Sequence, residues 1–296
     1  MSIYEAVRDC IRAEEEVAMA TVVELTDPSE WETPPRAGER MPEPGAKVVV
    51  RPGRPVLGTT GDADLDRVVA RDALGALESG LTGTRHYGRH GQANQREVAV
   101  FVEAFAPPPL MVIFGAVDFT AALARVAKVL GYRVVVCDAR PVFATPARFP
   151  EADEVVVSWP DRYLDQVADQ LGPRDAVCVL THDPKFDVPA IVAALRTKVG
   201  YLGAMGSRRT HSERSERLLE AGVPPADLPR VMGPIGLAIG ARTPEETAVS
   251  ICAEIIALRI GGPGAGGVPS LRDARGPIHQ DGQLDPEDAS VPSEPD

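Results

Sequence analysis

The sequence predicts an α/β protein with a Rossmann-like, doubly wound parallel sheet in its C-terminal part and a smaller N-terminal α+β domain. After residue 109, strand-length apolar runs alternate with helical patterns, as in parallel sheets. Three consecutive prolines, Pro107 to Pro109, form a stiff linker in front of these runs. The length of 296 residues and the hydrophobic share of 44% fit two globular domains. We therefore expect domains at 1–106 and 107–261, followed by a disordered acidic tail at 262–296 that has almost no large apolar residues.

The predicted N-terminal domain begins with an amphipathic helix. Its apolar face consists of Ile3, Ala6, Val7, Cys10 and Ile11. Strands are expected at 18–25, 46–50, 54–58 and 96–105, with a helix at 65–77 that ends at Gly80. The turn Arg51-Pro52-Gly53 predicts a hairpin of the second and third strands, and 26–45 reads as a long loop.

The stretch 110–138 predicts a βαβ unit with a right-handed crossover. An apolar run at 110–114 is followed by a turn at Gly115, a helical pattern at 119–130 and a second apolar run at 134–137. Further strands are expected at 154–158, 176–180 and 199–202, and helices at 161–171 and 189–195. Ser207 caps a polar helix that reaches Gly222, and the capping box of Thr243 and Glu246 starts a last helix that ends at Gly261.

Charge and composition argue against several classes of protein. The net charge of -12 opposes nucleic-acid binding, and no apolar run approaches the roughly 20 residues that span a bilayer. The opening segment is amphipathic and acidic, unlike a signal peptide. Four separated cysteines in apolar surroundings indicate buried free thiols. We therefore expect a cytoplasmic protein without a membrane span or a nucleic-acid partner.

The candidate ligand site lies where the order of the parallel strands reverses. There the strands that begin at 110 and 176 become neighbours, so the loop after Gly115 should face the loop 181–187. The next loop, 203–209, adds a helix start with two arginines, which favours an anionic group. The candidate cofactor-binding residues are Gly115, Asp138, Arg140, His182, Asp183, Gly206, Ser207, Arg208 and Arg209.

Each candidate also has a purely structural interpretation. His182 and Asp183 would then form only a turn, and Arg208 and Arg209 would only face solvent. Asp138 follows Gly115 by 23 positions, close to the roughly 20 expected for the ribose-binding acid of a dinucleotide fold. NAD(P) stays doubtful, because Val117 replaces the second glycine of the phosphate loop and Asp118 adds a negative charge. No metal site is expected, because the histidines are scattered and His86 and His90 lie in a glycine-rich turn.

Several motifs resemble one known family. HDPKFD (182–187), YLGAMGSRR (201–209), GPIGLAIGARTPEETAVSICAEIIA (233–257) and VVVCDAR (134–140) resemble the C-terminal domain of the xanthine dehydrogenase accessory family, XdhC/CoxI. ATVVEL (20–25), PGAKVVV (44–50) and LGTTGDADLDRVV (57–69) resemble that family's first domain.

The resemblance implies a cytoplasmic, dimeric maturation factor that binds molybdenum cofactor of the molybdopterin type. Such a factor helps to load the sulfurated cofactor into a molybdenum hydroxylase client, xanthine or carbon monoxide dehydrogenase, with a cysteine desulfurase as a further partner. The favoured function is therefore non-catalytic. An NAD(P)-dependent oxidoreductase and a ligand-free interaction module are the alternatives.

Two positions depart from the family pattern. Members often carry GAGH-type residues after the first strand of the second domain, where this chain has Gly115-Ala116-Val117-Asp118. They also often carry a GGC-x-E motif in the first domain, where Asp64 and Asp66 stand in place of the cysteine and the glutamate. The chain is thus expected to be a divergent member that lacks the first-domain cysteine.

Overall fold

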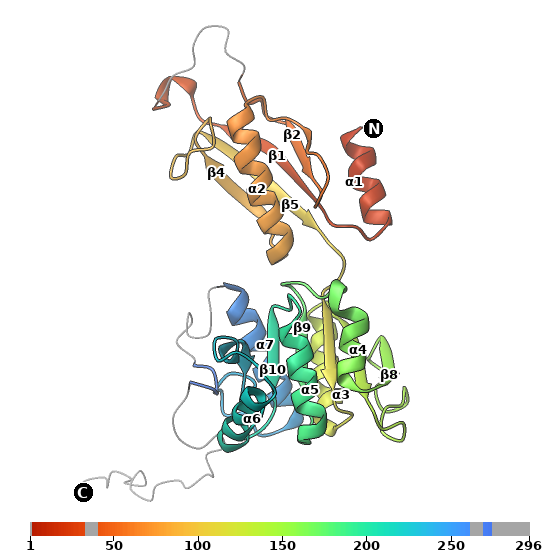
Figure 1. Ribbon diagram of the computed structural model, residues 1–296. Helices are drawn as coiled ribbons and strands as arrows, with labels where there is room; N and C mark the ends of the chain where they lie inside the picture. Colours follow the sequence, from red (N-terminus) through yellow and green to blue (C-terminus); the bar gives the residue numbers. More distant parts are fainter. Residues whose placement is uncertain (1, 33–40, 261–268, 274–296) are drawn as a thin grey trace, which may run out of the picture. The chain divides into compact units, whose positions relative to one another are not determined.

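The computed structural model describes residues 2–32, 41–260 and 269–273, and the chain divides into two compact units (Figure 1). The first unit consists of residues 1–109 together with 172–174. The second consists of 110–171 and the chain from 175 onward.

The N-terminal unit is built on a five-stranded antiparallel sheet in the order β3-β2-β1-β5-β4. Its elements are α1 (Ile3–Arg12), β1 (Val17–Leu25), the 3₁₀ turn η1 (Pro28–Glu30), β2 (Lys47–Val50), β3 (Leu57–Gly58), α2 (Ala63–Ser79), β4 (Gly83–Tyr87) and β5 (Val98–Phe105). The predicted hairpin of the second and third strands is confirmed.

Helices α1 and α2 cover opposite faces of the sheet in this unit (Figure 1). Leu65, Val69 and Ala73 of α2 pack against Ala20 and other apolar residues of the strands. On the other face, Val7 and Cys10 of α1 pack against Val17 and Val49.

The fourth strand was not predicted from the sequence. Four of its five residues are exposed and polar or small, because β4 lies at the edge of the sheet. The prediction that His86 lies in a turn is wrong, since His86 pairs with Ala99 inside the ladder of β4 and β5. An exposed edge strand lacks the apolar alternation by which strands are recognised.

The C-terminal unit confirms the predicted doubly wound sheet. Its six parallel strands have the order β11-β10-β9-β6-β7-β8. The elements are β6 (Leu110–Phe114), α3 (Asp118–Val129), β7 (Arg133–Asp138), β8 (Glu154–Val157), α4 (Pro160–Val167), η2 (Ala168–Gln170), β9 (Ala176–Val179), α5 (Pro184–Leu195), β10 (Tyr201–Ala204), α6 (Arg208–Glu220), η3 (Leu228–Arg230), β11 (Val231–Met232) and α7 (Pro244–Ile260).

Helices cover both faces of this sheet, and the side chains of each strand alternate between two cores. Met111 and Ile113 of β6 face the core that includes α3 and α7. Val112 and Phe114 face the core that includes α4, α5 and α6 (Figure 1). This two-sided burial explains why the strands read as continuous apolar runs.

The order of the strands reverses between β6 and β9, as predicted. Met111 pairs with Ala176 and Phe114 with Val179, so the carboxyl ends of these strands are neighbours. At Gly115, where φ is +108°, an added Cβ would lie 2.7 Å from the side chain of Thr181. The loops after β6 and β9 are therefore in direct contact, and this edge carries the candidate site.

Helix α5 begins five residues before its predicted start. Asp183 caps it, accepting a hydrogen bond of 3.1 Å from the backbone N–H of Lys185, and Pro184 is the first helical residue. The prediction that 184–187 belong to a loop is therefore wrong. Asp-Pro is a favourable helix start, because proline fixes φ and needs no hydrogen-bond partner in the first turn.

Part of the segment expected to be a disordered tail is described. Ser270 forms an isolated bridge with Leu237, and Ser270 is fully buried. The prediction for 262–268 and 274–296 lies outside the described residues.

Candidate functional site

A pocket of about 800 Å³ opens at the carboxyl edge of the sheet in the C-terminal unit. It is lined by the loops after β9, β10 and β11, by the N-terminal parts of α3, α6 and α7, and by Leu271. Its polar residues are His182, Ser207, Arg208, Arg209, Arg242, Thr247 and Ser250, and its large apolar residues are Phe119, Met205, Ile235, Leu237 and Leu271. Ligand sites commonly combine such an apolar lining with a few convergent polar groups.

The N-terminus of α6 forms one wall of the pocket. Ser207 caps the helix, as predicted, and its Oγ accepts a hydrogen bond of 3.1 Å from the N–H of Thr210. The first turn carries no acidic residue but contains Arg208 and Arg209. The N–H groups of the first turn, the helix dipole and two guanidinium groups therefore favour an anion at this wall.

A buried ion pair fixes this helix start relative to the neighbouring loop. The Nη2 of Arg214 on α6 donates to Asp187 Oδ2 at 3.1 Å and to the carbonyl of Met205 at 2.7 Å. Asp187 also accepts a hydrogen bond from Thr181 in the loop after β9. Both side chains are nearly inaccessible, at 3% and 5%. The loops after β9 and β10 are thus held together by a charge-assisted network.

Burial governs the electrostatics of this network. Burial raises the pKa of Asp187, although Thr181 and Arg214 oppose that shift. The Nη1 of Arg214 is buried and has no hydrogen-bond partner among the described residues. Burial also lowers the pKa of His211, one turn along α6, with Arg214 and Arg272 acting in the same direction. Burial at this helix start therefore disfavours the charged forms of both Asp187 and His211.

Five of the predicted site residues line this pocket: His182, Gly206, Ser207, Arg208 and Arg209. The other four, Gly115, Asp138, Arg140 and Asp183, do not line it. Asp183 is occupied in capping α5 and in a 3.1 Å ion pair with Lys185.

Asp138 is already saturated with hydrogen bonds. Its carboxylate accepts from the N–H of Ala116 at 2.8 Å and from the backbone N–H, Nε and Nη2 of Arg140 at 2.9, 2.9 and 2.7 Å. Burial alone would raise the pKa of Asp138, but these bonds outweigh burial and hold the pKa below its usual value. A ribose hydroxyl would have to displace Arg140.

In a dinucleotide fold the loop after the first strand binds the pyrophosphate, but in this chain other contacts occupy the backbone of that loop. The N–H of Ala116 is held by Asp138, and Arg148 donates to the carbonyl of Ala116 at 3.2 Å. Val117 is the N-cap of α3 and makes no side-chain cap, and Asp118 opens the helix with a negative charge. These contacts oppose the binding of a pyrophosphate after β6.

The lining residues that were not named as site candidates include Phe119, Arg242 and Leu271. Arg242 belongs to the glycine-containing stretch 240–242, which lies on the same edge as the other loops, so that position carried a usable signal. Leu271 follows a Gly/Pro-rich segment, and composition alone marked it as tail.

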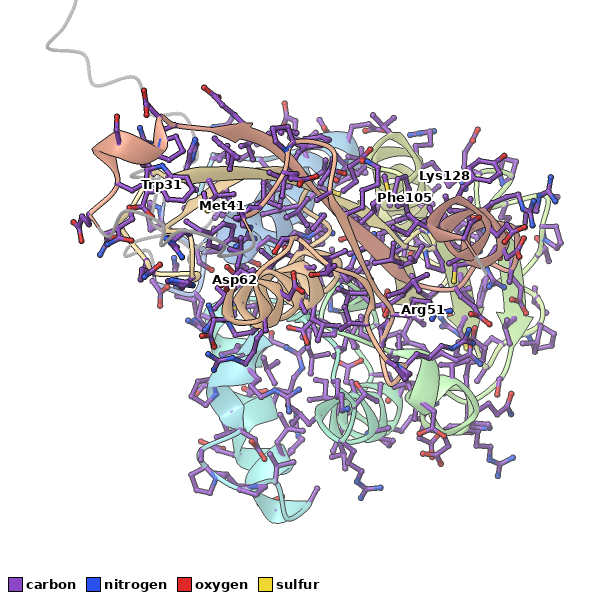
Figure 2. The ribbon with its side chains drawn as sticks, turned by 90° about the horizontal axis from the view of Figure 1, so that it is seen from above. Trp31, Met41, Arg51, Asp62, Phe105 and Lys128 are labelled. Atoms are coloured by element: carbon purple, nitrogen blue, oxygen red, sulfur yellow. The ribbon has the colours of Figure 1, made fainter. Side chains whose placement is uncertain are left out.

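The positions of the expected first-domain motif hold structural carboxylates. Asp66 accepts hydrogen bonds of 2.6 Å from Thr59 and Thr60, and the exposed Asp64 pairs with Arg67 at 2.9 Å. Asp62, labelled at the start of α2 in Figure 2, caps that helix and contacts His90 Nδ1 at 2.6 Å.

None of the four cysteines offers an accessible thiol. Cys10, Cys137, Cys178 and Cys252 are all buried and unpaired. Burial raises the pKa of Cys137 and of Cys252 to about 12, and it also raises that of Cys178. Thiols with such pKa values are protonated at neutral pH and unreactive.

The described residues hold neither a metal cluster nor a membrane-spanning helix. In that part of the chain, no group of three or more His, Cys, Asp or Glu residues is arranged to hold a metal ion. Likewise, none of its helices has both the length and the apolar character needed to span a bilayer.

Comparisons with known proteins identify the family. Residues 111–255 match the XdhC Rossmann domain, and residues 10–88 match the XdhC and CoxI family. A probable xanthine dehydrogenase subunit from Bacillus subtilis (strain 168) is 36% identical over 160 residues, 54% of this chain and 46% of that protein.

Two proteins of Escherichia coli (strain K12) are also similar. The uncharacterized protein YqeB is 27% identical over 75% of this chain and 42% of its own length. The molybdenum cofactor insertion chaperone PaoD is 33% identical over 34% of this chain and 31% of its own length. The matches thus span less than half the length of each of these relatives. Because one family match falls in each of its two units, the chain belongs to the XdhC and CoxI family.

Proposed function

We propose that this chain is a molybdenum-cofactor accessory protein that binds a molybdopterin-type cofactor and delivers it to a molybdenum hydroxylase. The observation that carries the proposal is the N-terminus of α6, where Ser207, Arg208 and Arg209 open onto a pocket of about 800 Å³. The names of the Bacillus subtilis relative and of PaoD support the same role.

The chemistry of the pocket fits a pterin that carries a phosphate. A terminal phosphate matches the N–H groups and guanidinium groups at the start of α6. The planar pterin matches the apolar side chains of Phe119, Met205 and Ile235, and the imidazole of His182 is available to its polar edge. A volume of about 800 Å³ lies within the range of small-molecule sites, roughly 300–1,000 Å³.

The state of the cysteines favours binding and insertion over sulfur transfer by this chain. A sulfur carrier needs an accessible thiolate, whereas all four thiols are buried and three have raised pKa values. Sulfuration of the cofactor would therefore use the thiol of a partner such as a cysteine desulfurase. A client hydroxylase and a homodimeric state belong to the same proposal.

A titration with molybdopterin tests the proposal. The changes Arg208→Ala and Arg209→Ala, made together, should weaken binding about tenfold or more. A charge-assisted hydrogen bond contributes roughly 1.5–3 kcal/mol, and roughly 1.4 kcal/mol corresponds to one decade of affinity. The matched control is Arg125→Ala with Arg133→Ala, which removes two exposed, ion-paired arginines away from the pocket.

The same titration with NAD and NADP tests the oxidoreductase alternative. No binding is expected, because Asp138 and Arg148 occupy the loop after β6. Val117→Gly should not create binding, since the Ala116 N–H stays engaged. Micromolar affinity for NAD would refute the proposal in favour of the oxidoreductase. If none of the three compounds binds, the ligand-free interaction module would be favoured.

A further inference from the structure

Residues 269–273, termed the C-terminal clip, are joined to the loop between β11 and α7. The N–H of Ala238 donates to the carbonyl of Pro269 at 2.9 Å, and the N–H of Leu271 donates to the carbonyl of Gly236 at 2.8 Å. The Nη1 of Arg272 donates to the carbonyl of Pro229 at 2.9 Å. The clip thus adds a bridge at Ser270 and a short turn to a loop that lines the pocket.

The anchor of the clip is the carboxylate of Glu254 on α7. This side chain is fully buried and accepts hydrogen bonds from three separate elements. Tyr201 of β10 donates its hydroxyl at 2.6 Å, Gly236 donates its N–H at 2.9 Å, and Ser270 of the clip donates its hydroxyl. A buried carboxylate is costly unless its oxygens are satisfied, so loss of any donor should loosen the others.

The clip also contacts the proposed anion site directly. Leu271 lines the pocket, and its carbonyl accepts a hydrogen bond of 3.3 Å from Arg208 Nη2. A guanidinium group held at a fixed place loses less side-chain entropy when it binds an anion. The position of Arg208 therefore depends on the position of the clip.

We infer that the C-terminal clip is a fixed wall of the ligand pocket, with Leu271 contacting the planar part of the ligand and Glu254 acting as the residue that positions the wall. The clip lies beyond residue 255, where the match to the XdhC Rossmann domain ends. Ligand selectivity in this chain would thus depend on a segment outside that domain. The inference rests on the proposed function, because it assumes that the pocket holds the pterin.

Three full-length variants test the inference. Ser270→Ala removes the anchor, Leu271→Ala shortens the wall and leaves the anchor in place, and Asp273→Ala is the control within the clip. Each is measured twice: by hydrogen exchange at the amides of Ala238 and Leu271, and by titration with molybdopterin.

The expected results distinguish the anchoring of the clip by Ser270 from the contact between Leu271 and the ligand. Ser270→Ala should speed exchange at both amides and weaken binding about tenfold, because both Leu271 and Arg208 lose their support. Leu271→Ala should leave exchange slow and weaken binding about fivefold, through the loss of apolar contact alone. Asp273 is exposed and outside the pocket, so its variant should match the parent in both measurements.

Two results would overturn the inference while the proposed function stands. One is rapid exchange at both amides in the parent, which would mean that the clip is not docked. The other is unchanged molybdopterin affinity in both Ser270→Ala and Leu271→Ala. If the parent itself binds no molybdopterin, the proposed function fails and the ligand contact of Leu271 fails with it. Slow exchange in that same sample would show that the docked clip exists independently of the ligand.

Discussion

At the scale of single residues, the same side chain can look like a ligand group in sequence and act as a structural group in the fold. Asp138 ends β7 at the spacing of a ribose-binding acid, yet its carboxylate is 2% exposed and bound to Ala116 and Arg140. The spacing reflects the βαβ geometry, which is shared by all folds of this class. The spacing does not reveal that the side chain of Arg140 folds back and donates to the carboxylate of Asp138.

This pair predicts a stability effect that depends on pH. Asp138→Asn should lower the free energy of unfolding at pH 7 by about 1.5–3 kcal/mol, the usual contribution of a hydrogen bond to a charged group. The folded-state pKa of Asp138 lies below its usual value of 3.8, so its contribution is present above about pH 4 and is lost as the pH falls through the folded pKa. Urea titrations at pH 7, 5, 4 and 3 should show the gap between parent and variant closing only at the acidic end. A gap of constant size would show that the carboxylate is not stabilised in its charged form.

At the scale of elements, helix starts were predicted well where a cap and a pattern coincide. Ser207 and the capping box of Thr243 and Glu246 were both recognised, and both caps are present. The start of α5 was missed because three of its first four residues, Pro184, Lys185 and Asp187, are polar or turn-forming and resemble a loop by composition. The burial of Asp187 is explained by its ion pair with Arg214 of α6, a contact with another helix that the local sequence does not reveal.

The cap of α6 allows helix stability to be separated from anion binding. Ser207→Ala should cost about 1 kcal/mol of stability, since it removes the acceptor for the Thr210 N–H. Ser207→Asp should keep the cap and the stability but weaken molybdopterin binding about tenfold or more, because a carboxylate would stand where the phosphate binds. Ser2→Asp, at the cap of α1 in the other unit, is the control for added charge. Equal affinities of Ser207→Asp and the parent would place the anion elsewhere.

At the scale of the whole chain, the doubly wound sheet and its point of reversal were predictable because they follow from apolar runs and general rules of connection. The pocket was only partly predictable. His182 and Ser207 lie in loops that follow strand ends, and Arg208 and Arg209 open the helix after β10; the order of these strands was predicted correctly. Arg242 lies in a glycine-containing stretch that carried a usable signal. Leu271 joins the pocket through contacts with the loop before α7, and such long-range packing leaves no local pattern.

The two units have separate hydrophobic cores. We therefore predict that molybdopterin binding stabilises the C-terminal unit and not the N-terminal unit. Leu65 of α2 and Leu123 of α3 are both fully buried, each in the core of its own unit. Changing either to alanine should cost its unit roughly 2–5 kcal/mol. Leu65→Ala should speed hydrogen exchange in the N-terminal sheet and leave molybdopterin affinity within about twofold of the parent, because every lining residue of the pocket belongs to the other unit. Leu123→Ala should speed exchange in the parallel sheet, and saturating molybdopterin should restore part of that protection, because a ligand stabilises the state that binds it. Loss of binding in Leu65→Ala would assign part of the ligand site to the N-terminal unit.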